Sequence, residues 1–112
     1  MIKLHINEKD FTPYTISKNE VIVRINSENK NGIIFYDEFR IPLVNKDVLI
    51  SSLIKANYPA DRMDAIRNNY ELVKDGTAGN KEEEYTQEYL AMQDWRAYSK
   101  ELTKEIIDSK EK

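Results

Sequence analysis

The hydrophobic period of this sequence changes near residue 45, and that change limits the fold more than any other feature. Before it, apolar and polar residues alternate, as in "IKLHI" at 2–6 and "VIVRI" at 21–25, a pattern typical of half-buried strands. After it, apolar residues recur every three or four positions, which indicates helices. The chain therefore predicts an α+β fold: a small N-terminal antiparallel sheet of three or four strands, followed by three helices of which the last is long.

Two more segments belong to the strand-rich part. "GIIFYDEFRIPL" at 32–43 is rich in branched and aromatic residues, and Pro42 keeps it from continuing in the middle of a sheet. "FTPYTI" at 11–16 is ambiguous but fits an edge strand, since Pro13 removes one backbone donor. "NSENKNG" at 26–32 gathers turn-forming residues and predicts the reversal of an antiparallel hairpin.

The first strand has a clear two-residue alternation. We expect Ile2, Leu4 and Ile6 on its buried face, and Lys3 and His5 on its polar face.

The helical part begins with a short helix from Asn45, a good capping residue, to about residue 56. A second helix should have Pro59 at its first position and end at the glycine-containing "DGTAGN". Its apolar stripe is Met63, Ile66, Tyr70 and Val73.

A third helix is expected from about residue 80 to about residue 108, with "KEEE" at the end where acidic groups suit the helix dipole. Its apolar side should run through Tyr85, Tyr89, Met92, Trp95 or Arg96, Tyr98 or Ser99, Leu102 and Ile106. The second helix is about half as long, so it cannot cover the whole of the third. The far half of the third helix should therefore either pack on the sheet or contact another chain.

Length and composition favour a single domain over 1–112, with a strand-rich part at 1–44 and a helical part at 45–109. The net charge of -3 arises from 17 basic and 20 acidic residues, too balanced to predict a nucleic-acid partner. Residues 57–112 carry 9 basic and 13 acidic side chains (net -4), so acidity gathers in the C-terminal half. No segment has the apolar length of a membrane span, and we expect no membrane partner.

Residues that could support catalysis or bind a cofactor are few. The chain has one histidine, no cysteine and only three glycines, without a phosphate-binding loop. His5 could be a general base but is better explained as an exposed strand residue. The carboxylates of Glu82, Glu83, Glu84 and Glu88 could hold a hard cation, although an effect at the helix N-terminus explains them better. We predict a non-enzymatic protein without metal or cofactor.

The aromatic residues of the third helix offer a different function. Tyr and Trp give large contact areas at low entropic cost, so they are common at protein interfaces. We predict a protein-interaction surface formed by Trp95, Tyr98, Leu102 and Ile106. Its partner would be a second copy of the chain, giving a homo-oligomer, or a larger assembly.

A resemblance supports this interpretation. "LISSLIKANYPADRMDAIRNNYEL", a short gap with glycines and then "EYLAMQDWRAYSKEL" resemble small proteins encoded by phages and prophages of Bacteroidetes. The shared pattern covers about residues 49–103: a tyrosine before an acidic helix start, an "AI..NY" core in which two positions vary, and a Trp-Arg pair followed by lysine. Such proteins lie among virion or tail-assembly genes.

The resemblance implies a structural or accessory protein of a phage particle, located in the virion or the host cytoplasm. It implies no binding or catalytic residue. The alternative is a soluble acidic inhibitor or regulator, of the anti-defence type, that binds a basic host protein.

Overall fold

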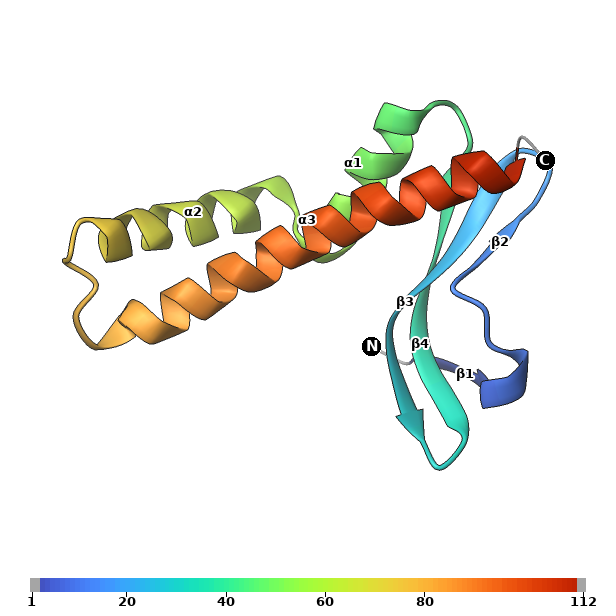
Figure 1. Ribbon diagram of the computed structural model, residues 1–112, viewed down its shortest axis with the longest axis horizontal. Coiled ribbons are helices and arrows are strands. Elements are labelled where there is room, and N and C mark those ends of the chain that lie inside the picture. Colours follow the sequence, from blue (N-terminus) through green and yellow to red (C-terminus); the bar gives the residue numbers. More distant parts are fainter. Residues whose placement is uncertain (1–2, 111–112) are drawn as a thin grey trace. The chain divides into compact units, whose positions relative to one another are not determined.

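The structure is a computed structural model that describes residues 3–110, and it confirms the predicted α+β fold. A four-stranded antiparallel sheet is followed by three helices, and the last helix is long (Figure 1). The strands are β1 (Leu4–Asn7), β2 (Tyr14–Ile16), β3 (Glu20–Lys30) and β4 (Ile33–Pro42), and the helices are α1 (Lys46–Asn57), α2 (Ala60–Lys74) and α3 (Glu82–Lys110). Short 3-10 turns, η1 (Glu8–Asp10) and η2 (Gly79–Lys81), precede β2 and α3.

The chain divides into two compact units, and the division runs through α1 and α3. Residues 1–49 and 106–112 form one unit, called here the sheet unit, and residues 50–105 form the other, called the helical unit. The start of α1 and the end of α3 therefore belong with the strands. Hydrophobic period alone could not find this division, because both helices continue across it.

The sheet has the strand order β1-β4-β3-β2, so two strands consecutive in sequence lie at opposite edges. The connection between them, with η1, must pass from one edge to the other. Two contacts mark its course: the ring of Phe11 lies 5.7 Å from that of Tyr36 on β4, and Arg24 on β3 donates to the carbonyl oxygen of Thr12.

The alternation predicted for residues 21–25 is confirmed. Val21, Val23 and Ile25 are buried, as is Ile41, which pairs with Val21 across the β3–β4 hairpin. These side chains point to one face, whereas Arg24 points to the other.

The predicted inward face of β1 is wrong at Leu4, which is 46% exposed. As an edge strand of four residues, β1 pairs only with β4, so little packs against it. Ile2, the other end of that predicted face, lies outside the described residues.

The β3–β4 hairpin confirms the predicted reversal, but not its length. β3 continues as a strand through Lys30, and the chain turns only at Asn31 and Gly32, whose φ angles are 56° and 85°. Two positive φ angles are what a tight hairpin turn requires, and Asn-Gly adopts them readily. The register shifts between Ile25 and Glu28 at a bulge, and the strand beyond it is exposed, which explains its polar composition.

Local signals fix the first two helices. The Val48 N–H donates to Asn45 Oδ1 at 2.9 Å, so Asn45 caps α1 as predicted. The second helix starts one residue later than predicted, because Pro59 is its N-cap rather than its first residue. In its apolar stripe Ile66 is buried and Tyr70 is half-buried.

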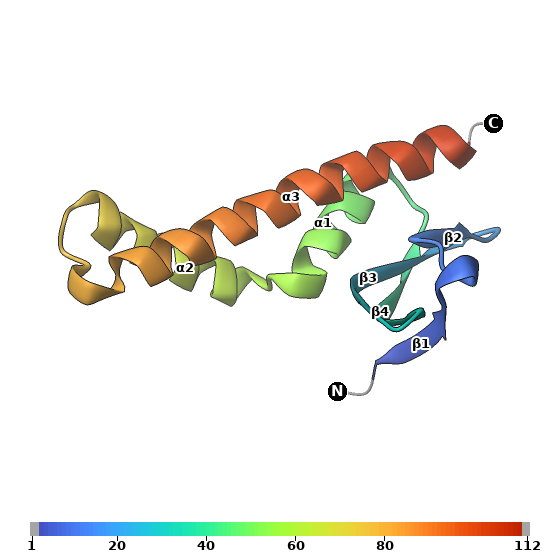
Figure 2. The ribbon, with the colours of Figure 1, turned by 60° about the horizontal axis from the view of Figure 1, so that its bottom comes forward.

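α3 is one continuous helix of 29 residues, as predicted. At about 1.5 Å per residue it is about 43 Å long. α2, with 15 residues, lies antiparallel beside the N-terminal half of α3 in both ribbon views (Figure 2). Tyr70 and Tyr89 stack between the two helices, with ring centroids 3.9 Å apart and planes 4° from parallel.

Candidate protein-interaction surface

The structure separates the four residues predicted to form one interaction surface. Leu102 and Ile106 are 3% and 0% exposed, so their side chains cannot contact a partner, and that part of the prediction is corrected. They fill the chain's own core, as apolar side chains at helical spacing commonly do. Trp95 is half-buried and Tyr98 is 42% exposed.

The Trp95 side chain is held in one orientation. Its indole Nε1 donates to the carbonyl oxygen of Leu53, 2.9 Å away on α1. Leu53 is itself fully buried, so the acceptor belongs to the core of the helical unit. Because χ1 and χ2 of the tryptophan are fixed by this bond, docking of a partner would cost little further entropy there.

The Tyr98 ring lies next to Trp95, with centroids 5.3 Å apart and planes inclined by 36°. Together, Trp95 and Tyr98 are called here the aromatic pair. Partial burial raises the pKa of the Tyr98 hydroxyl, and the negative charge of Glu105 raises it further. The hydroxyl therefore stays protonated at neutral pH and can both donate and accept a hydrogen bond.

Carboxylates flank the aromatic pair on α3. Asp94, Glu101 and Glu105 are all exposed, and their spacing from Tyr98 places them on the same side of the helix. Within the part of the chain that the structure describes, no ion pair engages Asp94 or Glu101. This aromatic and acidic surface is the strongest candidate for a contact site.

The other candidate residues do not converge on a site. His5 is exposed on β1, with its ring centroid 5.8 Å from that of Phe35. In the first turn of α3, Glu84 pairs with Lys81 at 3.2 Å and Thr86 donates to the Glu82 carbonyl. Among residues 3–110, no three histidine or acidic side chains are grouped so that they could hold a metal ion.

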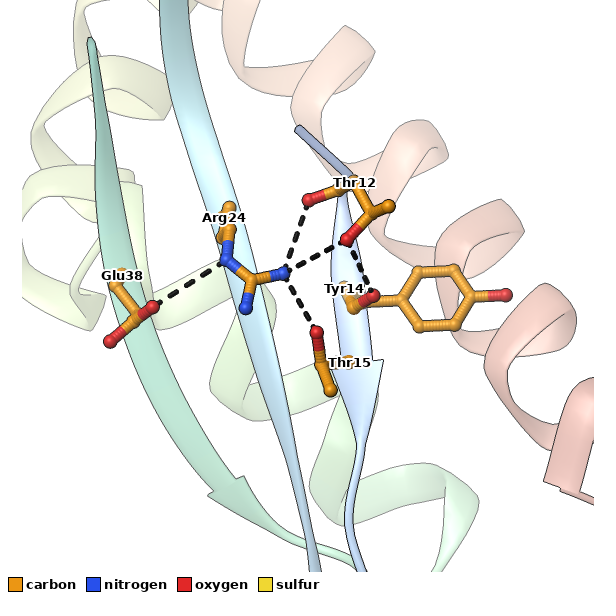
Figure 3. Close-up of polar contacts among 5 residues, drawn as sticks. All are labelled: Thr12, Tyr14, Thr15, Arg24 and Glu38. Atoms are coloured by element: carbon orange, nitrogen blue, oxygen red, sulfur yellow. Dashed lines mark hydrogen bonds and ion pairs between the residues drawn. The ribbon is translucent and has the colours of Figure 1, made fainter. Parts of the chain in front are cut away.

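One polar cluster was missed by the sequence analysis. Arg24 Nη1 donates to the carbonyl and hydroxyl oxygens of Thr12, both at 3.2 Å, and to Thr15 Oγ1 at 2.9 Å (Figure 3). Its Nε lies 3.5 Å from Glu38 Oε1, so one guanidinium joins β4, β3, β2 and the segment before β2. Its donors are directed at the chain's own oxygens, which makes it a structural clamp. These residues are close together only because of the way the strands pair, and the strand register could not be predicted from the sequence.

No helix in the described part of the chain is both long enough and apolar enough to cross a lipid bilayer. Comparisons with known proteins give no relative: no protein family, no curated protein and no solved structure matches this chain.

Proposed function

We propose that this protein is a non-enzymatic structural or accessory component of a phage particle or of its assembly, and that it acts through protein–protein contacts. The observation that carries the proposal is the aromatic pair, in which a fixed tryptophan supports an exposed tyrosine. The partner is a larger particle protein or a second copy of the chain.

The physical case rests on how binding energy is distributed over interfaces. A few tyrosine, tryptophan and arginine residues supply most of it, and they do so best when they are ordered before the partner arrives. Trp95 meets this condition through its hydrogen bond to Leu53, and the exposed part of Tyr98 provides the contact area. The particle context comes from the resemblance over residues 49–103, which covers nearly all of the helical unit.

The test uses Tyr98→Ala, because Trp95 also supports the fold. The purified chain is titrated calorimetrically with the capsid, portal and tail proteins encoded near its gene, and its self-association is followed by sedimentation velocity. Tyr98→Ala should weaken the observed association roughly tenfold or more, as truncation of an interface tyrosine does. Leu90→Ala is the matched control, since Leu90 is similarly exposed on the same helix, and it should bind as the wild type does. If the wild type binds none of these proteins and stays monomeric, the proposal is wrong.

A soluble inhibitor of a basic host protein is the second candidate, and the exposed acidic start of α3 favours it. In that case Glu82→Gln with Glu83→Gln would abolish binding to the host protein, whereas Tyr98→Ala would not. Such binding would also weaken steeply with salt, because exposed charges are screened over about 8 Å at physiological ionic strength.

A further inference from the structure

The turn between β3 and β4 has the features that make an asparagine chemically reactive (Figure 1). Asn31 is the only asparagine of the chain that glycine follows. Glycine has no side chain to hinder the approach of its backbone nitrogen to the side-chain carbonyl carbon of the preceding residue. Asn31 is exposed, and no atom of the described chain beyond the two neighbours of Gly32 lies within 4 Å of where a Cβ on Gly32 would be. Solvent therefore reaches this turn.

The chemistry needs only these two residues and water. The Gly32 nitrogen loses its proton to the solvent and forms a bond with Asn31 Cγ, and the Cγ–Nδ2 bond breaks to release ammonia. Water then opens the cyclic imide at one of its two carbonyl carbons. Attack at Cγ gives aspartate, whereas attack at the backbone carbonyl carbon gives isoaspartate, in which the main chain runs through Cβ and Cγ.

Two hydrogen bonds of the folded chain hold Gly32 in place. Its N–H donates to Asn29 Oδ1 at 3.0 Å, and its carbonyl oxygen accepts from the Glu8 N–H at 2.8 Å. Ring closure requires the Gly32 nitrogen to lose its proton and to rotate toward Asn31 Cγ. The hydrogen bond to Asn29 must break before this can happen, so Asn29 opposes the reaction.

We propose that Asn31 is a latent modification site: ring closure by the Gly32 nitrogen converts it to aspartate or isoaspartate without an enzyme, and Asn29 delays the conversion by holding that nitrogen. The reaction is independent of the partner that the chain binds, so the particle function and this site stand or fall separately.

Asn26 provides an internal comparison. Its φ angle is 56°, the same as that of Asn31. The residue after it is Ser27, whose side chain hinders the approach of the backbone nitrogen, and its own Nδ2 donates to Asp37 Oδ2 at 2.9 Å. We therefore expect Asn26 to convert more slowly than Asn31.

Isoaspartate would change the hairpin as well as its charge. Lys30 and Ile33 pair on either side of a turn of two residues, and such a turn has no room for the extra backbone carbon of isoaspartate. The new carboxylate would also lie close to Lys30, whose ammonium group is 3.8 Å from Glu28 Oε2. The end of the hairpin should therefore open after the modification, whereas the buried side chains Val21 and Val23 should stay packed.

The test follows the purified chain in mildly alkaline buffer made with ¹⁸O-labelled water, folded in one series and unfolded by urea in the other. Mass spectrometry of digested samples measures aspartate and isoaspartate at position 31. The label marks conversion during the incubation, because hydrolysis takes its oxygen from the solvent. The unfolded chain should convert Asn31 about tenfold faster than the folded chain, since the two hydrogen bonds of Gly32 are lost.

Two variants isolate the role of Asn29, which is exposed, so its replacement leaves the core intact. Asn29→Ala removes the acceptor and should speed conversion of the folded chain about threefold to tenfold. Asn29→Asp keeps an oxygen acceptor in the same place and should convert no faster than the wild type. In urea, Asn29→Ala and the wild type should convert at equal rates, because the hydrogen bond is absent from both.

Four results would each overturn the proposal. The site does not exist if the unfolded chain leaves Asn31 unchanged, and it is not latent if the folded and unfolded chains convert at the same rate. Asn29 does not protect it if folded Asn29→Ala converts at the wild-type rate, or if Asn29→Asp is accelerated as much as Asn29→Ala.

Discussion

The sheet unit has ion pairs that join neighbouring strands, and the helical unit has ion pairs within one short segment of chain. In the sheet unit, cross-strand ion pairs join Arg24 to Glu38 and Arg40 to Glu20. In the helical unit, two ion pairs are local: Lys74 with Glu71, and Lys81 with Glu84, each three residues apart. The ion pairs of Arg24 and Arg40 therefore join neighbouring strands of the sheet, whereas the two pairs of the helical unit connect residues close in sequence.

Their cores differ too. The sheet unit buries branched side chains such as Val21, Val23 and Ile41, which suit a pleated surface. The helical unit relies on a few aliphatic residues, Leu53 and Ile66 among them, together with stacked and hydrogen-bonded aromatic rings. A small core with large aromatic members should be sensitive to the loss of any one aliphatic residue.

Leu53→Ala tests that sensitivity and should have the largest effect. Leu53 is fully buried, so its truncation should lower the free energy of unfolding by about 2–5 kcal/mol through lost burial and an unfilled cavity. Urea unfolding followed by circular dichroism measures the change. Leu72→Ala, at an exposed site of α2, should cost less than about 1 kcal/mol, and equal costs for the two variants would contradict a core at Leu53.

Arg24→Leu tests the clamp of the sheet unit. The Arg24 side chain is 16% exposed, and its loss removes the ion pair with Glu38 and the hydrogen bonds to two threonine hydroxyls, so unfolding should become easier by about 1–3 kcal/mol. Adding Glu38→Leu should recover part of the loss, because the unpaired carboxylate is removed. Arg40→Leu, at a side chain that is 62% exposed, should cost less than about 1 kcal/mol in the same unfolding assay.

Thr103→Val should act in the opposite direction. The Thr103 hydroxyl is fully buried and has no hydrogen-bond partner among the described residues, so an apolar side chain of equal shape should stabilise the helical unit by about 1 kcal/mol. Thr86→Val is the control, since the Thr86 hydroxyl donates to the Glu82 carbonyl at 2.8 Å, and this variant should not stabilise. A lower thermal midpoint for Thr103→Val would show that its hydroxyl has a partner.

Tyr98→Phe should have the smallest effect, seen only in alkali. The folded pKa of Tyr98 is raised above the unfolded value of 10.0, so folding favours the neutral phenol. Its contribution to stability is complete below pH 10.0 and is lost as the pH rises through the folded pKa. The wild type should therefore lose more stability than Tyr98→Phe between about pH 9 and pH 11 in urea titrations, and parallel curves would contradict the shift.

Period and capping signals were sufficient for much of the fold. The alternation at 21–25 predicted the buried face of β3, Asn45 predicted the start of α1, and a long apolar pattern predicted an unbroken α3. These features depend on interactions between residues that are close in the sequence, so the sequence pattern predicts them. Asn31 and Gly32 also have a sequence typical of a tight turn. The polar residues before them were interpreted as part of the turn, although they belong to the end of β3.

The candidate surface was harder to predict because on α3 a polar side chain points inward and a more hydrophobic one points outward. The pattern left open whether Tyr98 or Ser99 faces inward, and hydrophobicity favours the tyrosine. The structure buries Ser99, whose hydroxyl donates to the Trp95 carbonyl at 2.9 Å, and turns Tyr98 outward. A serine whose hydroxyl donates to a backbone carbonyl of the preceding helical turn can be buried at low energetic cost. The hydrophobicity of the single residue does not predict this.

The edges of the sheet bear on how this protein behaves when it is crowded. β1 has four residues and β2 has three, with Pro13 directly before β2. Strands this short offer few backbone groups to a neighbouring chain, which is how soluble proteins discourage uncontrolled strand pairing and fibril growth. Many copies could therefore accumulate in a confined space without precipitating through these two strands, and ordered association would be left to side-chain chemistry elsewhere.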